Sequence, residues 1–429
     1  MTHHDWRQPD LLVCGGGVAG TVAAVAAARA GLRVLLLERY GFLGGNATAG
    51  AVAQFNSWQT AGGRRVVAGL ADAVVQGLRG YGAAGAHEVF TMSTGHVMDR
   101  VPYAPELLKL VLDDLTQQAG VQVLFHAVLQ GVTCVNRQVR QVQALTRGGS
   151  LTLQPRWVLD ASGDLELLRR VGAEFLDLEA GESLQPATLM FRFGPVDASV
   201  FGALSVSALA ELSARGYASG HLARMALHSS RDPDSDDHWF NISRLAVDAT
   251  DPRALSAAER EGRQQAWRAA QFLQAQVPGC GQGRLRAFAT QIGVRETRRV
   301  RGDHVLTAAE LLQPVRFDDA VAAGAYPIDI HPTQGGALDY RSLGPDHAYQ
   351  IPWRSLIPAG LDNTLVAGRG LSATHAALAA VRVMTISMAV GEAAGTAAAL
   401  LTRGNAATVR ALDVSTLQAQ LRAQGAILA

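Results

Sequence analysis

Lysine is almost absent from this sequence: Lys109 is the single example among 429 residues. A phosphate-binding loop of the Walker type needs a lysine directly after its last glycine, and Lys109 instead lies in the apolar run 106–110 with no glycine before it. Schiff-base chemistry also needs a lysine amine, so the sequence argues against it. Because the net charge is only +1, the chain shows no electrostatic footprint for nucleic acid.

Cysteine is also scarce. Cys14, Cys134 and Cys280 form no C-x-x-C pair, which argues against a dithiol redox centre or a thiolate zinc site and favours a reducing compartment. The first ten residues lack the pattern of a secretory signal. The longest apolar stretch, 383–401, is interrupted by Glu392, which is more typical of a buried helix than of a membrane span. We therefore expect a cytoplasmic protein with no metal, no membrane association and no nucleic-acid partner.

The chain does contain enough apolar material for large cores. Hydrophobic residues make up 48% of the sequence and charged residues 17%, so an ordered globular protein is expected. The length favours two or three domains at ~150 residues each. Neither H-E-x-x-H nor G-x-S-x-G occurs, which argues against a metalloprotease or a hydrolase of the nucleophile-elbow type.

Residues 10–38 have the order strand, glycine turn, helix, strand and acid. The first glycine permits a tight turn, the second lets the backbone approach a pyrophosphate, and the third lets the helix pack closely on the strand. The helix N-terminus attracts phosphate, and the acid can accept hydrogen bonds from an adenosine ribose. The residues given these roles are Gly15, Gly17, Val18, Ala19, Gly20 and Glu38. This motif predicts a dinucleotide-binding fold but does not separate FAD from NAD.

The loop 39–50 provides the distinction, because it is dense in glycine where an NAD-binding domain would usually enter its next helix. It resembles the second loop of the glutathione-reductase-like flavoproteins, in particular a bacterial group usually named only FAD-dependent oxidoreductases, on its fumarate reductase and HdrA-like side. The resemblance implies FAD, and no site for its covalent attachment is apparent. The implied contacts here are Arg39, Gly44, Gly45, Asn46, Ala47 and Thr48.

Later segments carry the same resemblance, which covers about residues 8–60, 100–175 and 285–405. A helix at 105–120 and a strand at 121–126 precede residues that would hold the adenine, and 129–153 reads as a three-stranded meander. Near the C-terminus a strand, a loop and a long helix would close over the flavin. The contacts that the resemblance implies in these segments are Ala127, Val128, Ala161, Ser162, Gly163, Gly368, Arg369, Arg382, Val383 and Met384.

The predicted fold class is α/β, with a Rossmann-like FAD-binding domain of three layers (ββα with a β-meander) and an inserted α+β cap. We expect the FAD-binding domain at 1–175 and 346–429 and the cap or substrate domain at 176–345. Within the cap, 254–276 should be helical and 229–237 should be an exposed polar loop. Residues 176–285 match no motif, so substrate identity should depend on them.

The expected chemistry is hydride transfer between a substrate carbon and the flavin N5. The resemblance implies that the helix that opens at Arg382 stabilises negative charge on the reduced ring. Arg295 and Arg298 could clamp an anionic or polar small-molecule substrate, and His331 or His375 could act as acid or base. Structural ion pairs and structural histidines are the alternatives for these four catalytic candidates. An NAD-dependent dehydrogenase and a non-catalytic flavin-binding subunit are the alternative functions, and the electron acceptor is not identified.

Overall fold

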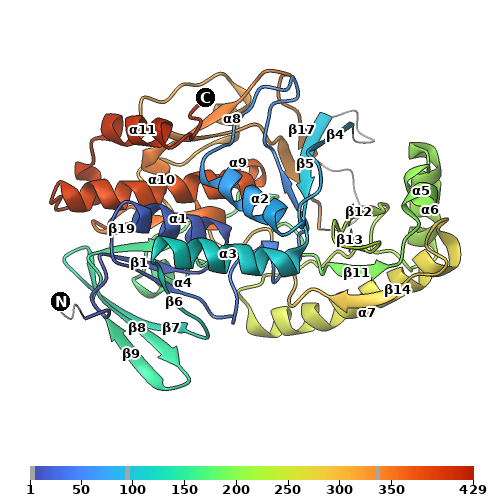
Figure 1. Ribbon diagram of the computed structural model, residues 1–429, viewed down its shortest axis with the longest axis horizontal. Helices are drawn as coiled ribbons and strands as arrows, with labels where there is room; N and C mark the ends of the chain where they lie inside the picture. The colour runs from blue at the N-terminus through green and yellow to red at the C-terminus, as the bar shows by residue number, and fades with distance from the viewer. Residues whose placement is uncertain (1–4, 92–96, 334–338) are drawn as a thin grey trace.

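A five-stranded parallel sheet forms the centre of the larger lobe in the computed structural model, which describes residues 5–91, 97–333 and 339–429 (Figure 1). The strand order is β19-β10-β1-β2-β6, and every pairing is parallel. Four of these strands are buried on both faces, which explains their continuous apolar sequence. The bounds are β1 Leu11–Cys14, β2 Val34–Leu37, β6 Gln122–Leu124, β10 Trp157–Asp160 and β19 Thr364–Val366.

The two faces of this sheet are covered differently. Leu11 and Val13 point into a core formed with helices α1 (Val18–Arg29), α3 (Pro105–Ala119) and α10 (Met384–Arg403), because alternate residues of a strand face opposite sides. Leu12 and Cys14 point into a second core with the antiparallel meander of β7 (Val128–Val135), β8 (Gln138–Thr146) and β9 (Gly149–Leu153). The three-layer arrangement with a meander confirms the predicted fold class.

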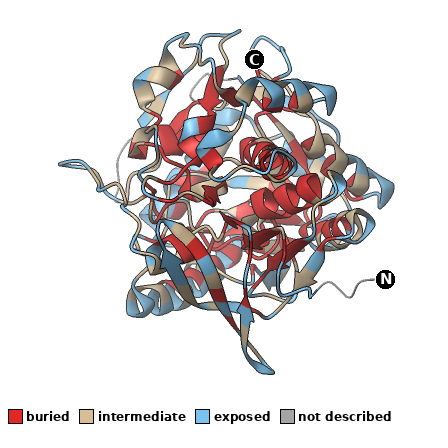
Figure 2. Cartoon of the chain, turned by 90° about the vertical axis from the view of Figure 1, so that its left-hand side faces the viewer, coloured by how far each residue is buried: buried red, intermediate tan, exposed pale blue. Residues whose placement is uncertain are grey.

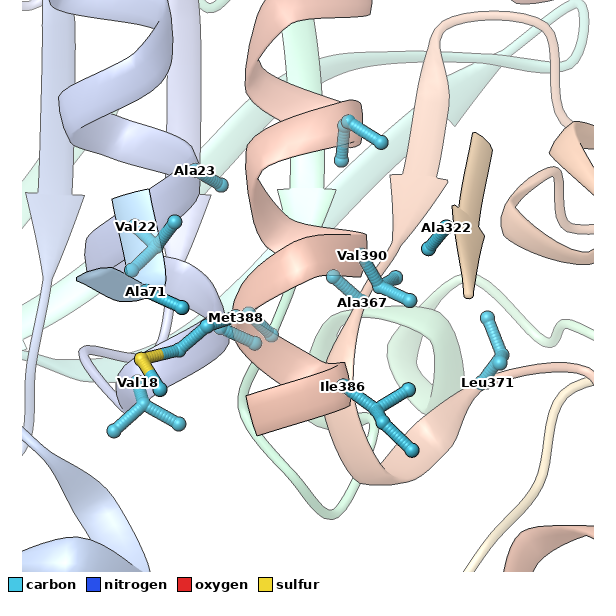
Figure 3. Close-up of a cluster of buried hydrophobic side chains, with 14 of the residues drawn as sticks. Val18, Val22, Ala23, Ala71, Ala322, Ala367, Leu371, Ile386, Met388 and Val390 are labelled. Carbon is cyan, nitrogen blue, oxygen red and sulfur yellow. The ribbon is translucent and has the colours of Figure 1, made fainter. Parts of the chain in front are cut away.

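Helices α1 and α10 pack with their backbones in close approach. A Cβ added to Gly391 would lie 2.2 Å from the Ala19 oxygen, and one added to Gly395 would lie 2.1 Å from the Ala23 oxygen. Apolar side chains from both helices surround this contact (Figure 3). By length and composition α10 could cross a membrane, yet 83% of its most apolar window is buried inside the protein. Figure 2 shows buried residues concentrated in these helices and in the sheet beneath them.

The smaller lobe, on the right of Figure 1, is built on a four-stranded antiparallel sheet in the order β12-β13-β11-β14. Its strands are β11 (Phe191–Gly194), β12 (His228–Arg231), β13 (His238–Asn241) and β14 (Arg284–Phe288), and its helices are α5 (Ala198–Gly202), α6 (Val206–Ala218) and α7 (Pro252–Gln276). Phe191, Phe193 and Phe240 lie in its core. The helix expected at 254–276 is therefore confirmed as α7.

The expectation of an exposed loop at 229–237 was wrong in part. Residues 229–231 belong to β12, and Ser230 and Asp232 are buried. The Ser230 hydroxyl donates to the Ala53 oxygen at 3.1 Å, and Asp232 accepts a hydrogen bond from the Trp239 indole at 3.2 Å. The partner of Ser230, Ala53, lies 177 residues away in the sequence, so the polar composition of this stretch alone suggested solvent exposure.

Part of the segment assigned to the cap lies in the large lobe. Leu306, Leu311 and Val321 join the core that contains α1 and α10, and β15 (Ala320–Gly324) pairs with β18 (Tyr349–Pro352).

The remaining elements are β3 (Gln54–Asn56), α2 (Leu70–Gly80), β4 (Glu88–Thr91), β5 (Val97–Pro102), α4 (Glu166–Arg170), α8 (Ala308–Leu312), β16 (Ile328–Ile330), β17 (Asp339–Arg341), α9 (His375–Val381), α11 (Val414–Ala423), and short 3-10 turns at 45–47, 353–356, 368–370 and 409–411.

Candidate functional site

The carboxyl edge of the parallel sheet brings together the segments that were expected to bind FAD. The glycine turn follows β1, Glu38 follows β2, Ala127 follows β6, Ala161 follows β10 and Gly368 follows β19. Because all five strands run in the same direction, these residues meet along one edge. This edge is where ligands bind in open α/β sheets.

The glycine turn leaves space for a ligand. Gly15 has φ +103°, and an added Cβ there would lie 2.6 Å from the Ala161 oxygen, while one on Gly20 would lie 2.0 Å from the Gly15 oxygen. A Cβ on Gly17 would meet nothing within 4 Å. Gly17 is also the N-cap of α1 and provides no side-chain cap, so the first N–H groups of the helix can bind an anion. The turn therefore fits a pyrophosphate.

Glu38 is fixed beside this turn. Its Oε2 accepts a hydrogen bond from the Gly16 N–H at 2.7 Å, and its Oε1 accepts one from the Tyr40 N–H at 2.9 Å. Burial raises the pKa of the Glu38 carboxyl, although these bonds oppose the shift. The Ala127 N–H donates to the Glu38 backbone oxygen at 3.0 Å, so the expected ribose and adenine segments are connected.

The second glycine loop is bonded to the first. The Gly44 N–H donates to the Gly16 oxygen at 2.7 Å, and Gly44 has φ +111°. In the other direction, Asn46 Nδ2 donates to the Val294 oxygen at 3.0 Å. The loop thus joins the glycine turn to the segment that carries Arg295.

Asp164, which follows the end of β10, binds side chains from two other segments. Its carboxylate accepts hydrogen bonds from Arg369 Nη2 at 2.7 Å and from the Thr297 hydroxyl at 3.0 Å. Arg298 Nη1 donates to the Asp164 backbone oxygen at 2.8 Å and lies 3.4 Å from Glu166. Arg298 therefore binds to the end of β10.

The start of α10 also offers unpaired polar groups. Its N-cap, Val383, has no side-chain cap, and Thr385 donates to the Asn56 oxygen, which holds the end of β3 there. Among the residues that the structure describes, Asn56 Oδ1 and Ser57 Oγ are buried without a hydrogen-bond partner. Orphaned polar atoms beside a helix N-terminus fit the polar edge of an isoalloxazine ring.

Beside this helix lies a group that we call the arginine cluster: Arg224, Arg295 and Arg382. Arg295 Nη1 donates to the Pro186 oxygen at 2.5 Å and to the Thr188 hydroxyl at 2.8 Å. Burial, together with the charges of Arg382 and Arg224, lowers the pKa of Arg295 to about 9. Burial and the charge of Arg244 lower the pKa of Arg224 to about 10, so Arg224 and Arg295 both stay charged at neutral pH.

Arg382, expected as a cofactor contact, is bonded to the backbone of the segment that carries Asp329. Its Nη2 donates to Gln185 Oε1 at 3.2 Å and to the Asp329 backbone oxygen at 3.4 Å. Oδ2 of Asp329 lies 3.2 Å from His331 Nε2 and accepts a hydrogen bond from the Tyr326 hydroxyl at 3.3 Å. The cluster thus faces one carboxylate that already has two side-chain partners.

The pKa values of His331 and Asp329 indicate the charge of each side chain at neutral pH. Burial and the charge of Arg295 lower the pKa of His331 to about 3. For Asp329, burial opposes ionisation, but the bond from His331 and the charges of Arg382 and Arg295 lower the pKa of the carboxyl. At neutral pH His331 is therefore neutral and Asp329 is ionised.

His375 lies apart from the cluster. Its Nδ1 is 2.9 Å from Oε1 of the buried Glu296, which also binds Arg299 at 3.3 Å and accepts the Gln185 N–H at 3.2 Å. Of the four predicted catalytic residues, the structure brings Arg295 and His331 together and places Arg298 and His375 elsewhere. His375 is connected to Arg382 through Glu296 and Gln185.

Sequence reasoning missed Asp329, Gln185 and Arg224. Asp329 lies two residues before His331, in a segment that had been singled out, so its spacing was a usable signal. Arg224 lies within 176–285, which match no motif, so the sequence carried no signal for this residue. Tyr326, also missed, lines a small hollow of about 50 Å³ with Ser57, Asp99 and Tyr340. Among the described residues, no group of His, Cys, Asp or Glu could hold a metal ion.

Both the sequence and the fold are similar to those of known proteins. The model of a family described as "FAD dependent oxidoreductase" matches residues 10–421. One similar solved structure is a geranylgeranyl bacteriochlorophyll reductase-like protein from Thermoplasma acidophilum, with 12% identity and a TM-score of 0.49 over 97% of this chain and 84% of that chain. A second is L-proline dehydrogenase from P. horikoshii, with 11% identity and a TM-score of 0.48 over 98% of this chain and 99% of that chain. A third is p-nitrophenol 4-monooxygenase from Pseudomonas putida DLL-E4, with 12% identity and a TM-score of 0.47 over 93% of this chain and 82% of that chain. No curated protein matches the sequence.

Proposed function

The chain belongs to the FAD-dependent oxidoreductase family, and from this premise we propose that it transfers a hydride between a small organic anion and N5 of the flavin. The observation that carries the proposal is the arginine cluster next to the start of α10, where three guanidinium groups face the single carboxylate of Asp329. Such an excess of cations favours an anionic ligand. Neither an NAD-dependent dehydrogenase nor a non-catalytic subunit is consistent with this family.

The residues that would hold FAD fit its chemical parts. Gly17 and the α1 N-terminus suit the pyrophosphate, Glu38 suits the ribose, and the start of α10 beside Asn56 suits the ring. When bound, FAD supplies a two-electron acceptor or donor, and the protein supplies binding and orientation.

Arg295 would hold the anionic group of the substrate. Two of its hydrogen bonds anchor Nη1 to Pro186 and Thr188, and its other guanidinium N–H groups have no partner among the described residues. A planar guanidinium held in this way can bind a carboxylate with two parallel hydrogen bonds. The substrate is thereby oriented, which is a large part of what a hydride transfer needs from a protein.

His331 is the proposed acid–base group. Because the ionised Asp329 can only accept hydrogen bonds, the His331 Nε2 that faces it must carry the proton. The lone pair of Nδ1 is then free to take a proton from the substrate, and a bound anion would offset the charge of Arg295 that helps to lower the pKa of His331. Asp329 would fix this tautomer, and the Tyr326 hydroxyl would hold Asp329 in place.

Arg298 and His375 support the site indirectly in this proposal. Arg298 would hold the end of β10 through Asp164, and His375 would hold Glu296, which positions Gln185 beside Arg382. The placement on the glutathione-reductase-like side of the family stays a prediction, as do the exact domain limits beyond the part of 176–345 that packs in the large lobe.

The test begins with the cofactor. Protein purified without added flavin should be yellow and should release FAD on denaturation, since nothing suggests covalent attachment. Under anaerobic conditions, a panel of organic acids and their neutral amides should bleach the flavin only where the acid group is present. A colourless protein that takes up no FAD would contradict the proposal, and equal bleaching by acids and amides would contradict the role of the arginine cluster.

A further inference from the structure

A narrow hollow of about 50 Å³ leads inward from the surface to Tyr326. Its lining includes the exposed residues Ser342 and Gly344 at one end and the buried residues Ser57 and Asp99 deeper in the protein. A water molecule needs about 10–15 Å³ of such space and two to four polar partners. The hollow is therefore large enough for a few water molecules.

The buried part of this hollow is polar. Among the residues that the structure describes, the Ser57 hydroxyl is buried without a hydrogen-bond partner. Asp99 Oδ2 accepts the Trp58 N–H at 2.9 Å and lies 2.8 Å from His87 Nε2. The His87 side chain is 33% exposed, so it connects Asp99 to solvent. These groups can bind water in the hollow and can exchange protons with the surface.

Tyr326 stands between this hollow and the proposed acid–base group. Its hydroxyl donates to Asp329 Oδ2 at 3.3 Å, and the same carboxylate oxygen lies 3.2 Å from His331 Nε2. All three side chains come from β16 and the residues beside it. They form one hydrogen-bonded series, with the hollow at the Tyr326 end and the free Nδ1 of His331 at the other end.

Such a series meets a need of the proposed reaction. When Nδ1 has taken a proton from the substrate, the product still covers that side of the ring. The imidazolium is unfavourable there, because burial and the charge of Arg295 lower the pKa of His331 to about 3. A second exit for the proton, on the Nε2 side, lets the ring become neutral before the product leaves.

We infer that Tyr326 relays protons between the Asp329–His331 pair and water in the hollow. Once Nδ1 holds the substrate proton, the Nε2 proton passes to Asp329 Oδ2. The proton on Asp329 then passes to the Tyr326 oxygen as the Tyr326 proton passes to water. Each N–H or O–H bond that breaks is matched by one that forms, so Asp329 is again a carboxylate, Tyr326 is again a phenol, and one proton has reached solvent.

The starting tautomer of His331 returns after product release. The Nδ1 proton is then lost to solvent on the open side, and one proton returns to Nε2 through the same series. Over the whole cycle, the substrate loses one proton and the solvent gains one. The inference rests on the proposed function, because it takes His331 as the acid–base group, and it makes Tyr326 a residue that acts through Asp329 and His331 without touching the substrate.

The experiment measures exchange of the His331 Nε2 proton with water by NMR. It uses holoenzyme with ¹⁵N-labelled histidine at pH 7, and formate is the anion that covers the open side; His331→Gln identifies the signal. Tyr326→Phe keeps the ring and removes the hydroxyl, so exchange should slow by at least ~10-fold. FAD content and the thermal midpoint are recorded for each variant.

The direction of the change separates a relay from a purely structural role. If Tyr326 only holds Asp329 in place, Tyr326→Phe loosens the pair, and exchange should become faster or the proton should move to Nδ1. The matched control is Tyr81→Phe, which removes a tyrosine–aspartate bond of 2.7 Å at the surface. It should leave the exchange of the His331 proton unchanged.

A second variant narrows the hollow without touching the series. Ser342 lines the hollow at its exposed end, so Ser342→Trp should slow exchange severalfold while the bond from Tyr326 to Asp329 stays in place. Arg341→Trp is its control, because Arg341 is exposed beside Ser342 and does not line the hollow. It should have no effect on exchange.

Unchanged or faster exchange in Tyr326→Phe, with FAD retained, would overturn the relay. Should Tyr326→Phe fail to fold, Ser342→Trp decides: slower exchange supports the relay and unchanged exchange overturns it. The proposed function fails separately, if the protein holds no FAD or if no organic acid bleaches it, and neither result depends on Tyr326.

Discussion

The backbone oxygen of Ala19 lies 2.2 Å from the point that a Cβ on Gly391 would occupy. Ala19 belongs to the helix that follows the glycine turn, and Gly391 belongs to the helix whose start faces the proposed flavin site. Helices α1 and α10 can approach this closely because glycine has no side chain. The contact joins the two ends of the FAD-binding edge into one packed unit.

Gly391→Ala should therefore lower both stability and FAD affinity. The added methyl group must push α10 away from α1, and overpacking of this kind costs ~1–3 kcal/mol. Thermal midpoints and FAD titrations would measure the two effects. Gly404→Ala is the matched control, because its Cβ would lie 3.4 Å from the Leu400 oxygen at the exposed end of the same helix. Equal midpoints for the two variants would contradict this account of the helix contact.

Glu38→Ala should weaken FAD binding while the protein stays folded. The substitution removes the acceptor proposed for the ribose and leaves the Gly16 and Tyr40 N–H groups without their partner. A loss of ~1–3 kcal/mol is usual for a hydrogen bond that involves a charged group. The measurement is a titration of apoprotein with FAD, and Glu106→Ala, on the exposed face of α3, is the control. Unchanged affinity would show that Glu38 serves only to shape the turn.

His331→Ala should keep bound FAD and a normal thermal midpoint but lose at least ~100-fold in turnover, the lower range for a positioned acid–base group. Asp329→Asn should also reduce kcat, since Asn can present its N–H₂ to Nε2 and favour the other tautomer of His331. His221→Ala, near the end of α6, is the control and should leave turnover unchanged. If His331→Ala instead releases the flavin or unfolds, His331 is a structural residue.

Glu392 provides a prediction about pH. It is buried within α10, its Oε2 accepts the Leu70 N–H at 2.8 Å, and burial raises the pKa of its carboxyl to about 7. Below the ordinary pKa of 4.5, both the folded and the unfolded chain hold this proton. Between 4.5 and about 7 only the folded chain holds it, so stability falls as pH rises, by up to ~1.4 kcal/mol per pH unit and about 3 kcal/mol in total.

Glu392→Gln removes this titration and keeps an oxygen to accept the Leu70 N–H. Its thermal midpoint should therefore match that of the unaltered protein at pH 4.5 and exceed it by a few degrees at pH 8, with the gap opening between these values. Thermal midpoints of both proteins, measured across this pH range, test both the direction and the size of the stability change that Glu392 causes. A gap that does not depend on pH would mean that Glu392 does not titrate as described.

How much could be predicted from the sequence differs between the cofactor edge and the substrate side. The strand, turn, helix and acid of residues 10–38 predicted both the parallel sheet and the place of Glu38, because each signal lies within a few residues of the element it specifies. The meander at 129–153 was predicted for the same reason. By contrast, the buried state of Ser230 was missed, since its partner Ala53 lies in another part of the chain.

By itself the sequence determined the dinucleotide-binding core, since strand and helix periodicity, glycine turns and terminal acids are local properties of a chain. Only the tertiary structure decided which side chains share the substrate side. Arg224, Arg295, Asp329 and Arg382 lie in four separate segments. The pKa values of Arg295 and Asp329 depend on burial and on the charges of residues in the other segments. His375, equally plausible in the sequence, is instead paired with Glu296. The physical reason is that desolvation and charge act through space, at distances that packing of remote segments sets and that no local pattern encodes.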